Sequence, residues 1–336
     1  MTRTVPGVAG TSGVAGSLVG VTHRPFVQPA TREVDVDGPV YVADYGGPGD
    51  APLLVAVHGL GGSHLNWSAV APYLTDHYRL VAVDLIGHGR TPAAGRTPDV
   101  DGHVAMLDGA LTQLSDRPVV LMGNSLGGLV SALCAAQSPD RVAGLVLVDP
   151  ALPTGQLRPV HPRVVSNFLL CSLPGVGERY LAARRSRTTA EQSVRRVLAV
   201  TCVDPTRVRA DVVDAHIELT ASRDRAQGDT AYLASARSLA RLMARPGPTV
   251  DRLGTLAHPV LHLHGERDVL VPLSAARRMA EGRTGWRLEV ARGIGHAPML
   301  EAPEWTALRI GEWLDGDGDV ARRRAARPAG STSPAQ

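Results

Sequence analysis

Residues 118–127 read PVVLMGNSLG, an apolar run that leads directly into a pentapeptide of the form G-x-S-x-G. The run predicts a buried strand, and the small apolar residues at 128–136 predict a helix behind it. Strand, sharp turn and helix are the setting in which this pentapeptide forms a nucleophile elbow. Gly123 and Gly127 permit the turn, because a side chain at either position would collide with neighbouring backbone. The pattern predicts that the Ser125 hydroxyl stands out of the turn, open to a base.

A glycine-rich loop, HGLGGS at 58–63, follows a second apolar run at 52–57. Such a loop can offer backbone N–H groups to a developing oxyanion, and Leu60 is the predicted first donor. The second predicted donor is Leu126, the residue after the serine. A nucleotide-binding interpretation fails, because the third glycine of G-x-G-x-x-G would fall on His64, and the chain has no lysine for a phosphate-binding loop.

An acid and a histidine follow two late apolar runs. Asp268 comes after the predicted strand at 259–263, in a G-x-x-D-x-x-x-P setting, and His296 comes after the predicted strand at 286–290. The three polar residues therefore occur in the order Ser, Asp, His. Asp149 also ends a predicted strand and is the alternative acid.

Together these segments resemble the α/β-hydrolase family, in the group that carries a cap domain. The resemblance covers roughly residues 30–315, and its motifs are specific jointly rather than singly. It implies a mostly parallel eight-stranded sheet flanked by helices, with an inserted helical cap domain. The expected strands lie at 33–37, 40–45, 53–57, 79–83, 118–122, 144–148, 259–263 and 286–290.

The resemblance also implies roles for individual residues. Ser125 would be the nucleophile, His296 the general base and acid, and Asp268 the carboxylate that orients His296. The N–H groups of Leu60 and Leu126 would form the oxyanion hole. These residue types suit the chemistry, because histidine titrates near neutrality and a buried carboxylate fixes its tautomer.

The expected domain organisation follows from the spacing of the strands. The interval between the sixth and seventh strands is too long for a single crossover helix and has a helical pattern of its own. The sequence predicts a flexible leader at 1–29, an α/β core at 30–150 and 258–315, a helical cap at 151–257 and a disordered tail at 316–336.

The predicted activity is hydrolysis of carboxylic esters with small or medium apolar acyl groups, through an acyl-enzyme. A serine at the nucleophile position argues against epoxide hydrolases and haloalkane dehalogenases, which use aspartate. A C–C bond hydrolase and a cofactor-free perhydrolase or haloperoxidase are the alternatives. Asn124 beside the nucleophile resembles the C–C bond hydrolases, whereas Leu60 stands in the oxyanion loop where many of those enzymes have a small residue. A non-catalytic binding scaffold is the alternative from another class, since a fold does not fix a function.

A substrate pocket is expected between the glycine loop, the elbow and the cap. Its predicted lining residues are His58, Gly59, Gly61, His64, Trp67, Asn124, Phe168 and Leu169. Among the histidines, His58 and His88 are expected to brace loops beside the pocket, and His262 and His264 to satisfy hydrogen bonds in the core. No metal is expected, because no H-E-x-x-H motif or paired-cysteine spacing is present.

Composition narrows the class further. The chain has 336 residues, 44% of them hydrophobic, and no apolar stretch approaches the roughly 20 residues of a membrane span. Three scattered cysteines indicate no disulfide framework, so a cytoplasmic location is expected. Aromatic residues make up 4% of the chain and no recognition motif is present, so nucleic-acid binding is not expected. The expected partner is a small-molecule ester; no cofactor is expected, and the sequence does not indicate an oligomeric state.

Overall fold

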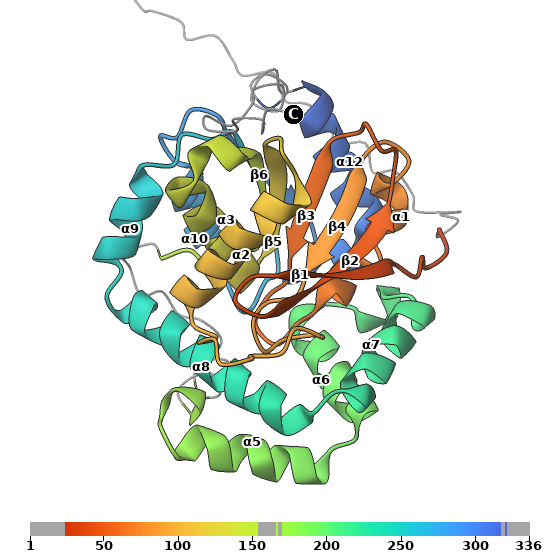
Figure 1. Ribbon diagram of the computed structural model, residues 1–336, viewed down its shortest axis with the longest axis vertical. Helices are drawn as coiled ribbons and strands as arrows, with labels where there is room; N and C mark the ends of the chain where they lie inside the picture. Colours follow the sequence, from red (N-terminus) through yellow and green to blue (C-terminus); the bar gives the residue numbers. More distant parts are fainter. Residues whose placement is uncertain (1–23, 154–165, 167–169, 317–319, 321–336) are drawn as a thin grey trace, which may run out of the picture.

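A twisted eight-stranded sheet with helices on both faces forms the centre of the protein (Figure 1). The computed structural model describes residues 24–153, 166, 170–316 and 320. The strand order is β1-β2-β4-β3-β5-β6-β7-β8, with β1–β2 and β2–β4 antiparallel and the other pairs parallel. The predicted fold class is therefore confirmed.

The strands have the following bounds: β1 (Ala30–Asp35), β2 (Pro39–Gly46), β3 (Leu53–Val57), β4 (Arg79–Val83), β5 (Val119–Asn124), β6 (Val142–Val148), β7 (Val260–Gly265) and β8 (Trp286–Ala291). The helices of the core are α1 (Ala71–Leu74), α2 (Val100–Leu114), α3 (Leu126–Gln137), α10 (Leu273–Ala280), α11 (Pro298–Glu301) and α12 (Pro303–Gly316). The core also has the short 3-10 turns η1 (His64–Trp67) and η2 (Pro139–Arg141), and the turn η3 (Pro205–Arg207) lies between β6 and β7. The first strand ends earlier than predicted, because Asp37 and Gly38 have φ angles of 49° and 125° and form the hairpin turn.

Alternating side chains of the central strands supply two separate cores. Val55 and Val57 of β3 pack in the cluster on the α2 and α3 face, whereas Leu54 and Ala56 pack in the cluster on the face of α1 and α12. This alternation, with both faces covered by helices, explains why the strands read as nearly continuous apolar runs. Because β3 to β8 run parallel, the loops that follow these strands lie together at one edge of the sheet.

A helical insertion between β6 and β7 covers that edge (Figure 1). Its helices in the described part of the chain are α5 (Val176–Arg187), α6 (Ala190–Thr201), α7 (Ala210–Ser222), α8 (Arg225–Ala244) and α9 (Gly247–Gly254). Two residues of α8 lie against loops that follow strands: a Cβ added at Gly61 would lie 3.2 Å from Tyr232, and one at Gly87 would lie 2.3 Å from Ala231. Of the helices that the structure describes, none has the length and apolarity to cross a bilayer.

The two histidines of β7 differ in how they are satisfied. His264 Nε2 lies 3.0 Å from the carbonyl of Val271, but neither ring nitrogen of His262 has a hydrogen-bond partner among the residues described. Within the described part of the chain, the prediction that His262 satisfies core hydrogen bonds is therefore wrong. Burial and the nearby His264 lower the pKa of His262 to about 3.

Replacing His262 with leucine is expected to reduce the pH dependence of stability. The buried ring stays neutral in the folded protein but takes up a proton in the unfolded chain below its ordinary pKa of 6.5. The share of the unfolding free energy that depends on the neutral His262 ring is therefore fully present above pH 6.5, and it is lost as the pH falls towards 3. Urea unfolding should show that the loss of unfolding free energy from pH 7 to about pH 5 is about 2 kcal/mol smaller in His262→Leu than in wild type. An equal loss in both proteins would contradict this account.

Candidate active site

Ser125 occupies a strained backbone conformation between β5 and α3. Its φ and ψ angles are 54° and −116°, in a region that non-glycine residues rarely adopt. The Ser125 N–H donates to the carbonyl of Val148 at 3.0 Å, and the Ser125 carbonyl accepts from the N–H of Leu129 at 3.2 Å. These bonds tie the turn to β6 on one side and to the first turn of α3 on the other.

The flanking glycines are required by close backbone contacts. A Cβ added at Gly123 would lie 2.4 Å from the carbonyl oxygen of Gly127, and one at Gly127 would lie 2.3 Å from the carbonyl oxygen of Val57. Helix α3 therefore begins directly against the end of β3, where the glycine loop starts. A Cβ at Gly59 would lie 3.2 Å from the Cβ of Ser125, so the loop and the candidate nucleophile are in contact.

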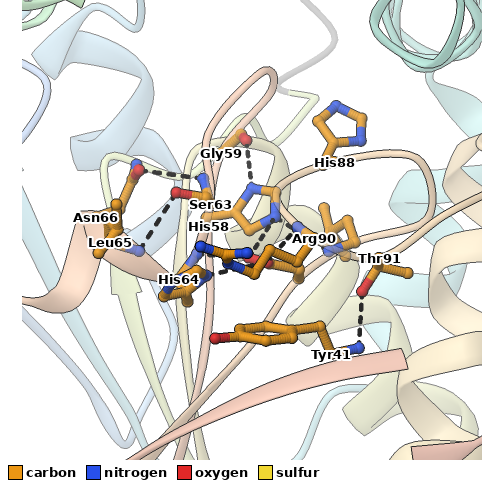
Figure 2. Close-up of polar contacts among 12 residues, drawn as sticks. Tyr41, His58, Gly59, Ser63, His64, Leu65, Asn66, His88, Arg90 and Thr91 are labelled. Carbon is orange, nitrogen blue, oxygen red and sulfur yellow. Dashed lines mark hydrogen bonds and ion pairs between the residues drawn. The ribbon is translucent and has the colours of Figure 1, made fainter. Parts of the chain in front are cut away.

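His58 holds the first peptide of the glycine loop (Figure 2). Its Nε2 accepts from the N–H of Leu85 at 3.0 Å, so in the neutral ring the proton is on Nδ1, which donates to the carbonyl of Gly59 at 2.8 Å. Burial lowers the pKa of His58, in keeping with a neutral ring. The Gly59 carbonyl also accepts from the N–H of Gly62 at 3.0 Å. Because the peptide is trans, Leu60 directs its N–H to the side opposite this doubly held carbonyl.

Asp84 joins the glycine loop to the loop after β4. Its buried carboxylate accepts from the backbone N–H of His64 at 2.5 Å, from Nδ1 of His64 at 2.9 Å and from the N–H of Arg90 at 2.8 Å. Burial alone would raise the pKa of Asp84, but the charge and hydrogen bonds of His64 hold it below its ordinary value. A Cβ at Gly89 would lie 2.0 Å from the carboxylate, so this turn accepts only glycine.

Replacing His58 with phenylalanine is expected to lower kcat about tenfold to a hundredfold, because the Leu60 N–H would lose its fixed direction. KM should change little. The steady-state kinetics of p-nitrophenyl butyrate hydrolysis measure both. The matched control is His88→Phe. The His88 ring is buried 5.6 Å from the His58 ring, and among the described residues it hydrogen-bonds only to the carbonyl of Ile86. Equal kcat losses in the two variants would show that the hydrogen bond to Gly59 has no special role.

His296 and Asp268 form a hydrogen-bonded pair beside the elbow. His296 Nδ1 lies 2.7 Å from Asp268 Oδ2, and the other oxygen of Asp268 accepts from the N–H groups of Leu270 and Val271 at 2.7 and 3.0 Å. Burial alone would raise the pKa of Asp268, but His296 and these hydrogen bonds hold it below the ordinary value. The carboxylate is thus fixed in position and charged, as the orientation of an imidazole requires.

Asp149, the alternative acid, lies behind this pair. Its Oδ1 accepts from the N–H of Gly265 at 2.9 Å, and Asp149, His264 and Asp268 have potential ligand atoms within 4.8 Å of one another. Burial and the charge of Asp268 raise the pKa of Asp149 well above its ordinary value, in contrast to the pKa of Asp268. Both oxygens of Asp268 are already hydrogen-bonded, which favours support of His296 over a cation site.

Asparagine substitutions should separate the two acids. Asp268→Asn is expected to lower kcat/KM by about 10³-fold or more, because His296 loses the group that selects its tautomer. Asp149→Asn should cost less than about tenfold, because the asparagine oxygen can still accept the hydrogen bond from the N–H of Gly265. Kinetics of the same ester at pH 7.5 measure both. A larger loss in Asp149→Asn than in Asp268→Asn would assign the acid to β6 instead.

Several residues predicted to line a pocket have structural contacts of their own. Asn124 donates through Nδ2 to the carbonyls of Val148 and His296, at 3.1 and 3.2 Å, and so connects the elbow to the histidine loop. Trp67 is fully buried in the core on the α1 and α12 face, and the His64 ring is committed to Asp84. The place of these three residues in a substrate pocket stays a prediction. Phe168 and Leu169 lie outside the described residues, so their place in a pocket stays a prediction.

Known proteins agree with this architecture. The sequence profile of the alpha/beta hydrolase fold family matches residues 52–303, and the chain belongs to this family. It is 30% identical to the pimeloyl-[acyl-carrier protein] methyl ester esterase of Aromatoleum aromaticum, over 79% of this chain and 99% of that esterase. It is 40% identical to the lipase LipV of Mycobacterium tuberculosis, over 34% of this chain and 42% of the lipase.

A solved structure extends the similarity to three dimensions. The crystal structure of a membrane phospholipase A, described as a bacterial virulence factor, superposes with a TM-score of 0.66 and 25% identity, covering 89% of this chain and 88% of that one. The two sequence relatives are named as an esterase and a lipase, and the solved structure shares the fold described above.

Proposed function

We propose that the protein is a serine hydrolase that cleaves carboxylic esters through an acyl-enzyme intermediate. The observation that carries the proposal is the hydrogen bond between His296 and Asp268, made beside the strained elbow that holds Ser125. The esterase and lipase relatives support ester substrates.

In the proposed mechanism, His296 Nε2 accepts the proton of the Ser125 hydroxyl as its oxygen attacks the ester carbonyl. Asp268, bonded to Nδ1, stabilises the imidazolium that forms. The N–H groups of Leu60 and Leu126 stabilise the negative charge on the tetrahedral intermediate. His296 then returns the proton to the departing alcohol. A water activated by the same histidine releases the acid from Ser125.

The helical insertion is proposed to act as a cap that closes the substrate pocket and excludes water. Its contacts with the glycine loop, through Tyr232 at Gly61, support this role. The apolar residues of the elbow and loop, Leu60 and Leu126, favour small or medium apolar acyl groups.

Labelling with a fluorophosphonate tests the nucleophile. Intact-mass analysis of the wild type should show one covalent adduct, because an activated serine attacks the phosphorus. The adduct should be absent in Ser125→Ala, which should also lose ester turnover by about 10⁴-fold or more. Circular dichroism of the variant serves as the control for folding.

A series of p-nitrophenyl esters from acetate to laurate then tests the acyl group. The proposal expects the highest kcat/KM for short or medium chains. Absence of label in the folded wild type would favour a binding scaffold, and a preference for charged acyl groups would contradict the apolar pocket.

A further inference from the structure

Glu301, at the end of α11, is a buried carboxylate with an unusual set of partners. Its side chain is 3% exposed, and it forms no ion pair with any residue in the part of the chain that the structure describes. Instead it accepts three backbone hydrogen bonds. Oε2 accepts from the N–H of Gly295 at 2.8 Å and of Val203 at 3.1 Å, and Oε1 accepts from the N–H of Asp204 at 2.8 Å.

These three donors come from two segments far apart in the sequence. Gly295 immediately precedes His296 in the loop after β8, whereas Val203 and Asp204 follow α6 in the helical insertion. One carboxylate therefore bridges the histidine loop, defined as residues 293–297, and the insertion segment, defined as residues 201–204. Removing it would leave buried N–H groups in both segments without an acceptor.

The two segments also contact each other directly. The N–H of His296 donates to the carbonyl of Thr201 at 2.6 Å. A Cβ added at Gly295 would lie 2.5 Å from that same carbonyl oxygen, so the backbones are closely packed. Behind the loop, a Cβ at Gly265 would lie 1.8 Å from the carbonyl oxygen of Gly295. The peptide before His296 is thus held between the end of β7 and the insertion segment.

A buried carboxylate is costly unless charge-assisted hydrogen bonds compensate for lost hydration. A fold that needed only packing at this place could use an apolar side chain. Among the described residues, the compensation at Glu301 comes from the N–H before His296 and from two N–H groups of the insertion segment, whose Thr201 carbonyl accepts from the His296 N–H. Small displacements of a catalytic group cost much in rate: about 1 Å can cost 10²-fold.

We propose that Glu301 is a positioning residue for the general base, acting by clamping the histidine loop to the insertion segment. The proposal rests on the proposed function of His296. Under this proposal the position of His296 depends on the position of the insertion segment. Displacement of residues 201–204 would displace His296 relative to Asp268. Glu301 itself touches neither substrate nor the reacting atoms.

The test compares Glu301→Gln with Glu266→Gln. The matched control, Glu266, is exposed and accepts from the N–H of Gly293 at 2.9 Å, in the same loop but without a link to the insertion. Glu301→Gln is expected to lower kcat for p-nitrophenyl butyrate about tenfold or more, with KM within about twofold of the wild type. Its rate of inactivation by a fluorophosphonate should fall by the same factor. The low-field proton resonance of His296 Nδ1–H should broaden or shift. Glu266→Gln should match the wild type in all of these.

A purely structural role would lower the melting temperature of Glu301→Gln while leaving kcat and the inactivation rate of the folded protein unchanged, and that result would overturn the proposal. If the wild type itself takes no label, the proposed function fails instead.

A measurement on the wild type covers the case in which Glu301→Gln does not fold. Hydrogen exchange followed by NMR should show the amides of Val203, Asp204 and Gly295 exchanging with one common protection. Fast exchange at Gly295 with slow exchange at the other two would show that no clamp exists.

Discussion

The backbone conformation of Ser125 is the constraint on which the rest of the site depends. A non-glycine residue at a φ of 54° costs of the order of 1–3 kcal/mol, and it persists only when its surroundings hold it there. Here the start of α3 is pressed against the end of β3, at a distance that leaves no room for a Cβ at Gly127. The same contact brings the glycine loop against the serine, so one strained turn sets the position of both the nucleophile and the loop that faces it.

Buried polar side chains that bind backbone groups fix the positions of the other loops of the site. His58 fixes a peptide of the glycine loop, Asn124 binds the carbonyl of His296, and Glu301 binds the N–H before it. Each bond is made at the carboxyl edge of the sheet, where loops from different strands meet. Because buried polar groups without partners are costly, such bonds specify loop positions that apolar packing would leave less well defined.

The sheet was predicted from the sequence, since its strands leave local signals. Apolar runs ending in glycine-rich turns identify parallel strands, and they located Ser125, Asp268 and His296 at strand ends. Contacts between distant segments leave no such signal. The acceptor role of Glu301 depends on residues almost 100 positions away, and the local sequence does not indicate those partners. The prediction for His262 was wrong for the same reason, because strand alternation predicts burial but not whether a buried ring has hydrogen-bond partners.

A crystal structure of the protein inactivated by a fluorophosphonate would test the central claim most directly. It shows which residue carries the phosphonyl group and which backbone N–H groups contact its oxygen. The account predicts a phosphonyl group on Ser125 Oγ, with one phosphonyl oxygen about 2.7–3.1 Å from the backbone nitrogens of both Leu60 and Leu126. An adduct on another residue, or a phosphonyl oxygen that contacts neither nitrogen, would contradict it.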